Sequence, residues 1–92
     1  MEITIDSNVV VADEVVSCDL EDEAAILNMK DGVYYGLDPV GARIWNLLQK
    51  PVKVGDILET LLAEYEVEEQ ECQSDLIELL RELEEKELVK IE

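Results

Sequence analysis

The chain has 92 residues, of which 24 are Asp or Glu and 7 are Lys or Arg, so its formal net charge is −17. A chain of this length corresponds to one small domain, which excludes a large two-lobed enzyme. The charge argues against nucleic acid as a partner, because affinity for phosphate backbones comes from Lys and Arg. Hydrophobic residues make up 48% of the chain, which argues against disorder. We therefore expect one folded, acidic domain over residues 1–92 that favours cationic partners.

Residue types that are common in catalytic and metal centres are scarce. The chain has no His, which removes the commonest general base and the commonest metal ligand. Cys18 and Cys72 match no CxxC zinc pattern, and we interpret each as a small buried hydrophobe with a reduced thiol. The sequence also contains no Gly-rich phosphate loop and no Ser elbow. It therefore predicts a protein that is not an enzyme, with no catalytic residues, no metal and no cofactor.

The N-terminal segment predicts the compartment. Residues 1–6 form neither a basic n-region nor an apolar h-region of a signal peptide. No apolar run approaches the ~20 residues of a membrane span. These observations favour a cytoplasmic protein without a membrane partner.

The first half of the chain carries short strand signals. β-branched runs predict a strand at about 9–16, and two further apolar runs predict strands at about 23–29 and 33–37. Asp31-Gly32 between the last two runs is a hairpin signal, because a tight turn requires positive φ. Alternation places Val33, Tyr35 and Leu37 on one face of the last strand, and Tyr34 and Gly36 on the other. On the preceding strand, the expected inward-facing residues are Ala25, Leu27 and Met29.

The second half carries helical periodicity. Asp38-Pro39 provides an N-cap and a favoured first helical residue, so a helix is expected at about 39–49. Apolar stripes predict further helices at about 54–65 and 69–87, and alternation in 88–91 allows a short last strand. Strands followed by helices indicate an α+β domain, with a three-stranded antiparallel sheet that keeps an open edge.

Several segments, taken in order, resemble one protein family. Residues 32–48 read GVYYGLDPVGARIWNLL, which resembles the coenzyme PQQ synthesis protein D signature, written G-x-Y-Y-x-L-[ND]-x-[VT]-G-x-x-I-W. Residues 54–57 and 74–83 are similar to the second and third helices of that family. Leu88-Val89 matches its usual ending, although Glu87 stands where Gly is common. The resemblance covers about residues 9–91.

The resemblance implies a winged helix-turn-helix-like domain that recognises peptides and performs no chemistry. Such domains capture the leader segment of a ribosomally made precursor peptide and deliver it to modifying enzymes. The wording around residues 34–37 is most similar to the free-standing leader-binding protein of lasso peptide biosynthesis, whose partners are a separate leader peptidase and a cyclase. Two alternatives remain: a PQQ-pathway-type peptide chaperone for a radical enzyme, and an adaptor for a cationic protein.

A leader-binding site follows from the resemblance together with strand physics. An open strand edge accepts an extended peptide as a further strand. In the family, the receiving strand corresponds to residues 33–37, and the third helix forms the opposite wall. The expected leader-binding residues are Val33, Tyr34, Tyr35, Gly36, Leu37, Asp75, Leu76, Ile77 and Leu80.

Simpler interpretations of these residues stay open. Val33, Tyr35 and Leu37 could be plain core residues, and Asp75 could be a solvated residue near a helix N-terminus. We expect Trp45 to be core. The glutamates at 64–71 and 82–87 form either a solvated face or an attraction for a basic leader. A winged helix would ordinarily suggest DNA, but residues 69–87 hold eight acidic side chains against two basic ones, which disfavours phosphate contact.

Overall fold

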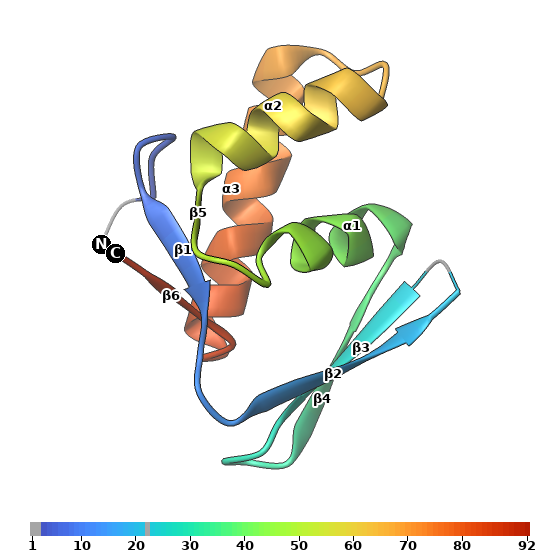
Figure 1. The fold of residues 1–92 in the computed structure, drawn as a ribbon, viewed down its shortest axis with the longest axis vertical. Coiled ribbons are helices and arrows are strands. Elements are labelled where there is room, and N and C mark those ends of the chain that lie inside the picture. The colour runs from blue at the N-terminus through green and yellow to red at the C-terminus, as the bar shows by residue number, and fades with distance from the viewer. Residues whose placement is uncertain (1–2, 22) are drawn as a thin grey trace.

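The computed structural model describes residues 3–21 and 23–92. Within these residues, three helices accompany two antiparallel three-stranded sheets, whose strand orders are β5-β1-β6 and β2-β3-β4 (Figure 1). The strands are β1 (Asn8–Val11), β2 (Val15–Leu20), β3 (Glu23–Asn28), β4 (Val33–Leu37), β5 (Val52–Lys53) and β6 (Val89–Ile91). The helices are α1 (Pro39–Leu47), α2 (Val54–Glu64) and α3 (Glu69–Glu85). The α+β class predicted from the sequence is confirmed, and the winged helix-turn-helix-like description is compatible with this arrangement.

The prediction of a single strand at 9–16 is wrong. Residues 13 and 14 form a turn with Glu14 at a φ of 59°, so the segment divides into β1 and β2. β1 pairs with β5 and β6, whereas β2 pairs with β3. The sequence predicted one three-stranded sheet and did not predict β5, whereas the structure has a second sheet of β5, β1 and β6. β5 has only two residues, which is too short to carry a periodic signal.

The hairpin β3–β4 forms as predicted, but β3 buries the opposite face. Its four-residue loop spans 29–32, and Gly32 supplies the left-handed turn conformation at a φ of 71°. Register pairs Ile26 with Tyr35 and Ala24 with Leu37, so these residues share the face that the helices cover. The buried residues of β3 are Ala24, Ile26 and Asn28, not the expected set Ala25, Leu27 and Met29.

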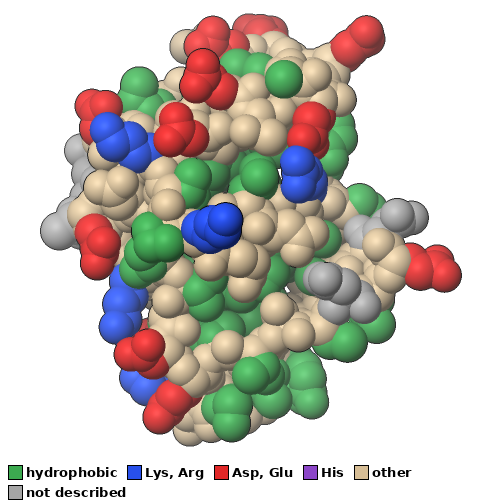
Figure 2. Space-filling view, viewed as in Figure 1, with side chains coloured by type: hydrophobic (Ala, Val, Ile, Leu, Met, Phe, Trp, Pro, Cys, Tyr) green, Lys and Arg blue, Asp and Glu red, His purple; other side chains and the backbone are tan. Residues whose placement is uncertain are grey.

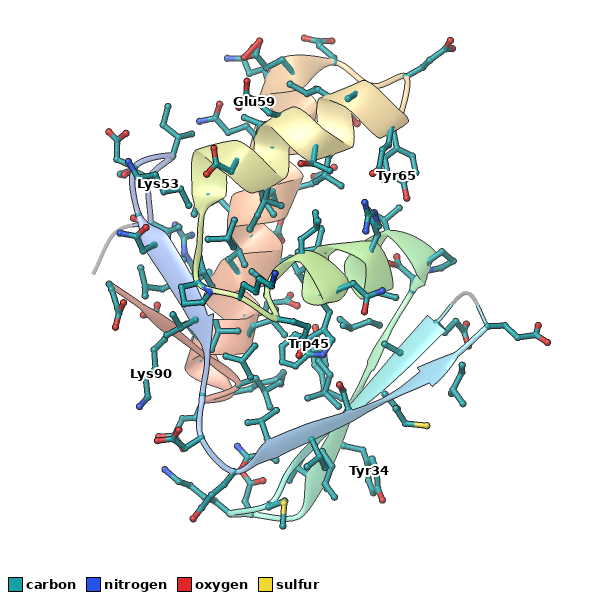
Figure 3. The ribbon with its side chains drawn as sticks, in the orientation of Figure 1. Tyr34, Trp45, Lys53, Glu59, Tyr65 and Lys90 are labelled. Carbon is teal, nitrogen blue, oxygen red and sulfur yellow. The ribbon has the colours of Figure 1, made fainter. Side chains whose placement is uncertain are left out.

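The three helices begin where the sequence predicted and end one or two residues earlier. The Asp38 side chain caps α1 by accepting a hydrogen bond from the Gly41 N–H at 2.8 Å, which satisfies one of the orphan donors of the first turn. Trp45 is buried, as predicted. Figure 3 shows it between α1 and the sheet β2-β3-β4. The largest fully buried residues also include Ile26, Leu48, Ile57, Leu76, Leu80, Leu83 and Leu88. This core joins both sheets to the helices.

The end of α3 explains the departure at Glu87. The Leu88 N–H donates to the Leu83 carbonyl at 2.9 Å, and the Glu87 N–H donates to the Glu84 carbonyl at 3.0 Å. These two bonds form a Schellman motif. The residue directly after the helix cap in this motif adopts the left-handed conformation that Gly favours. Glu87 adopts it with a φ of 60°. The helix therefore terminates in the geometry that usually selects Gly, although this chain carries Glu.

We expect Glu87→Gly to raise the free energy of unfolding by about 0.5–1 kcal/mol, because Gly adopts positive φ without the Cβ clash. Denaturant unfolding measures the change. Glu78→Gly is the control: Glu78 is exposed in the interior of α3, so the substitution should lower the free energy of unfolding by about 1 kcal/mol. Equal destabilisation by both substitutions would contradict the assigned backbone conformation.

Candidate functional site

A groove of about 820 Å³ lies between β4 and α3. Its sheet side is formed by Tyr35, Gly36 and Leu37. Its helix side is formed by six residues of α3: Glu71, Cys72, Asp75, Leu76, Leu79 and Glu82. Each of them lies three or four residues from another member of the set, so all six share one face of α3. The groove therefore has one wall of extended backbone and one wall of helix.

β4 has a free edge beside this groove. It is the last strand in the order β2-β3-β4 and pairs only with β3 within the described residues. An edge strand presents backbone N–H and C=O groups without ladder partners, and an extended peptide can pair with them. The chemistry that this geometry offers is strand addition, with alternate side chains of the added strand directed into the groove.

The far end of the groove has an apolar lining, and the charged residues around the groove are acidic. Beyond Leu37, the apolar lining continues through Val40 and Ile44 of α1, Leu61 of α2, and Tyr65 and Val67 after α2. The charged residues among the lining are all acidic: Asp38, Glu66, Glu68, Glu71, Asp75 and Glu82. Figure 2 shows red side chains crowded over the α2–α3 end of the molecule. The groove can hold apolar side chains under a negative rim.

The near end of the groove is crossed by a hydrogen bond. The Tyr35 hydroxyl donates to Glu82 Oε2 at 2.7 Å, and the Lys86 ammonium lies 5.3 Å from the centroid of the Tyr35 ring. The bond to Glu82, followed by burial, raises the pKa of Tyr35 from 10.0 to about 12. The phenol therefore remains a neutral donor to the carboxylate throughout the physiological range.

We expect a ¹³C NMR titration of labelled Tyr to place the pKa of Tyr35 near 12, and Glu82→Gln to bring it back toward 10. Because the folded-state pKa is the higher one, the hydrogen bond stabilises the fold fully below pH ~10. That stabilisation is lost as the pH rises from about 10 to 12. An ordinary pKa for Tyr35 in the unchanged protein would contradict the 2.7 Å bond.

The chain that carries this groove and strand edge is similar to known proteins. The sequence profile of the family described as "Coenzyme PQQ synthesis protein D (PqqD)" matches residues 23–89. The chain belongs to this family. The match spans β3 to β6 and therefore includes both walls of the groove. No curated protein matches this PqqD-family chain.

Two solved structures are similar to the PqqD-family chain. One is described as "TbiB1 in Complex with the TbiA(beta) Leader Peptide". It is 40% identical to this chain, and the aligned region covers 88% of this chain and 94% of that one, with a TM-score of 0.84. The other is described as "Lasso peptide synthetase B1 complexed with the leader peptide", with 23% identity, coverage of 89% and 96%, and a TM-score of 0.80. At that identity, the second structure supports the fold alone. Both proteins were solved with a leader peptide bound.

Five of the nine expected site residues line the groove of this PqqD-family chain: Tyr35, Gly36, Leu37, Asp75 and Leu76. Leu37 and Leu76 are also buried, so they form its floor. The groove is also lined by four residues that were not predicted from the sequence: Leu79, Val40, Tyr65 and Val67. The helical stripe of α3 contained Leu79, but periodicity alone did not separate it from the core leucines.

The other four expected residues do not line the groove. Leu80 is fully buried in the core, and Ile77 packs against that core, because both lie on the inner face of α3. Val33 is 56% exposed beside the hairpin loop, and Tyr34 is 71% exposed on the opposite face of β4. Figure 3 shows Tyr34 pointing away from the helices. For Val33 and Tyr34, only the backbone of the edge strand stays beside the site.

The sheet β2-β3-β4 has a second, apolar surface. Register places Val16, Leu27 and Tyr34 in one row across the strands, and Cys18, Ala25 and Gly36 in the next. Val16 is 48% exposed and Leu20, further along β2, is 52% exposed. We call Val16, Cys18, Leu20, Ala25, Leu27 and Tyr34 the outer face. The prediction that Cys18 is a buried hydrophobe is wrong, because the residue is exposed on this face. Figure 2 shows hydrophobic side chains along this lower side of the molecule. Neither complete row contains a charged residue, in a chain of which 34% is charged.

Neither a metal centre nor a membrane span is found within the described part of the chain. No group of three or more His, Cys, Asp or Glu side chains there is arranged to hold a metal ion. No helix within the described ranges has the length and apolar character needed to cross a bilayer.

Proposed function

We propose that this chain binds the leader segment of a ribosomally made precursor peptide, of the lasso peptide type, by adding it as a strand to β4. The observation that carries the proposal is the free edge of β4 beside an apolar groove. It occurs in a chain 40% identical to a protein solved with a leader peptide. The proposal gives the chain a binding role without a catalytic step, in the cytoplasm, where precursor peptides are synthesised.

The groove accounts for affinity as well as geometry. Ladder hydrogen bonds contribute about 0.5–1.5 kcal/mol each after desolvation, which does not by itself offset the ordering of a disordered leader. Two or three apolar side chains buried at about 1.5–3 kcal/mol each supply the remainder. Tyr35, Leu37 and Leu79 line the space that such side chains would fill. Micromolar to nanomolar affinity is therefore the expected range.

Calorimetry with synthetic leader segments tests the function. The peptides are taken from the short reading frames beside this chain's gene, with the TbiA(beta) leader as a comparison. We expect one neighbouring leader to bind with micromolar or lower Kd, and backbone amides of β4 to gain hydrogen-exchange protection in the complex. Failure of every neighbouring leader to bind at high micromolar concentration would overturn the proposal. Binding without protection of β4 would overturn strand addition.

Delivery to a processing enzyme is the second half of the proposal. The outer face lies on the side of the sheet away from the helices, so an enzyme docked there leaves the β4 edge and the groove accessible. A second copy of this chain is disfavoured as the occupant, since two chains of −17 repel each other. Glu21 and Glu23 are exposed at one end of the outer face, which suits a partner with an apolar patch bordered by basic residues. We assign this role to a separate leader peptidase.

The charge of the rim gives this function a measurable salt dependence. If the acidic lining attracts a basic leader, affinity should fall as ionic strength rises from about 0.05 to 0.5 M, because screening shortens the reach of exposed charges. Calorimetry at several NaCl concentrations measures the slope. Constant affinity would assign the acidic rim to solubility instead.

A further inference from the structure

The two walls of the groove are joined at one end by side chains of the β3–β4 hairpin and the last turns of α3. Tyr35 donates to Glu82 at 2.7 Å. Asn28 Nδ2 donates to the Lys86 carbonyl oxygen at 3.2 Å. The Lys86 ammonium lies over the Tyr35 ring. We call these three contacts the clasp. They connect two segments that lie about 50 residues apart in the sequence and pack on opposite sides of the groove.

Asn28 is the least expected member of the clasp. It is a buried polar side chain, only 3% exposed, and such burial is unfavourable unless its groups are hydrogen-bonded. Its Oδ1 accepts from the Lys30 N–H at 2.9 Å, while its Nδ2 reaches Lys86. The last carbonyls of a helix have no partners within the helix. One amide therefore orders the hairpin loop and satisfies the end of α3.

The clasp occupies one end of the groove only. On α3 the lining ends at Glu82, and on β4 it ends at Tyr35. In the other direction it continues past Asp75 to Val67 and Tyr65 at the α2–α3 loop. Both walls are thus fixed to each other at the Tyr35 end, and the rest of the groove extends away from that point.

We propose that Asn28, Tyr35 and Glu82 are positioning residues, which hold β4 at the separation from α3 that an added strand requires before the peptide arrives. This inference rests on the proposed function. A binding site that is already ordered loses less conformational freedom on binding. If the walls moved independently, only a fraction of molecules would be competent, and the apparent Kd would rise in inverse proportion to that fraction.

A double-mutant cycle on the clasp tests this role. Tyr35→Phe removes the hydroxyl and keeps the ring, and Glu82→Ala removes its acceptor. Each should weaken binding of the neighbouring leader peptide about fivefold to tenfold, with slower association. The double variant should lose no more than either single variant, since both remove one bond. Glu82→Gln keeps an acceptor and should bind within about twofold of the unchanged protein. Glu78→Ala, exposed on α3 outside the groove, is the matched control.

Residual dipolar couplings of the unbound protein separate positioning from mere stability. We expect the orientation of α3 relative to β3 and β4 to be the same with and without peptide in the unchanged protein, and to be averaged in Tyr35→Phe. The positioning role would be overturned by any of three results: reduced stability with unchanged Kd, additive losses in the cycle, or an unaltered orientation of α3 in Tyr35→Phe. A lack of leader binding by the unchanged protein would instead overturn the proposed function, and the unbound couplings would still test the clasp.

Discussion

Leu79→Ala is expected to weaken leader binding about tenfold while the fold persists. Leu79 lines the groove and is half-buried, so truncation removes apolar contact with the added strand. A loss of about 1.4 kcal/mol corresponds to a factor of ten in Kd. Calorimetry measures the affinity, and denaturant unfolding should show a stability loss of about 1 kcal/mol or less.

Its neighbour Leu80 is the matched control. Leu80 is fully buried and lies outside the groove lining, so Leu80→Ala should lower the free energy of unfolding by about 2–5 kcal/mol through the cavity it leaves. The folded fraction should bind the leader within about twofold of the unchanged protein. Affinity losses of equal size for both variants would contradict the separation of groove and core along α3. Leu76 is unsuitable for such a test, because it is 1% exposed and belongs both to the floor of the groove and to the core. Its truncation would change affinity and stability at once.

If the outer face docks a leader peptidase, as proposed, Tyr34→Lys should lower the affinity of that docking at least about a hundredfold and leave leader binding within twofold. Tyr34 is the most exposed large hydrophobic residue of the described chain, at 71%. A charge there would be buried without a partner in an apolar interface, which costs several kcal/mol. The fold should persist, because substitutions at exposed positions usually change stability by about 0.5 kcal/mol or less.

The measurement is direct binding of a purified leader peptidase to the protein, with and without bound leader. Gln70→Lys introduces the same charge at an exposed position of α3 outside the groove, so it controls for net charge. Normal docking of Tyr34→Lys would remove the outer face as the enzyme's site. Loss of leader binding in Tyr34→Lys would show that the side chain of Tyr34, and not only its backbone, reaches the peptide.

Part of the site is predictable from the sequence, because its signals are local. Asp38-Pro39 determined the start of α1, and the strand alternation of 33–37 correctly grouped Tyr35 and Leu37 on one face. The ordered motifs in residues 32–48 pointed to a family that residues 23–89 then matched. The departure at Glu87 was visible too, and its φ of 60° explains why Gly is common there.

Other features depended on distant partners. The division of 9–16 between two sheets required β5 and β6, whose residues pair with β1 from more than 40 residues further along the chain. The buried face of β3 depended on register with β4, and a shift of one residue exchanges the two faces. Asn28 looked like an ordinary strand-end residue, and only its contact with Lys86 revealed it as part of the clasp.

By itself, the sequence determined the helices, the hairpin, the acidic character and the family, because capping, turn chemistry, periodicity and charge are properties of neighbouring residues. Tertiary structure decided which side of each element meets the core, the groove or solvent. Leu79 and Leu80 are adjacent and chemically identical, yet one lines the groove and the other is core. The 100° turn between successive helical residues separates them, and only the packing of α3 against the core and β4 assigns each direction a function.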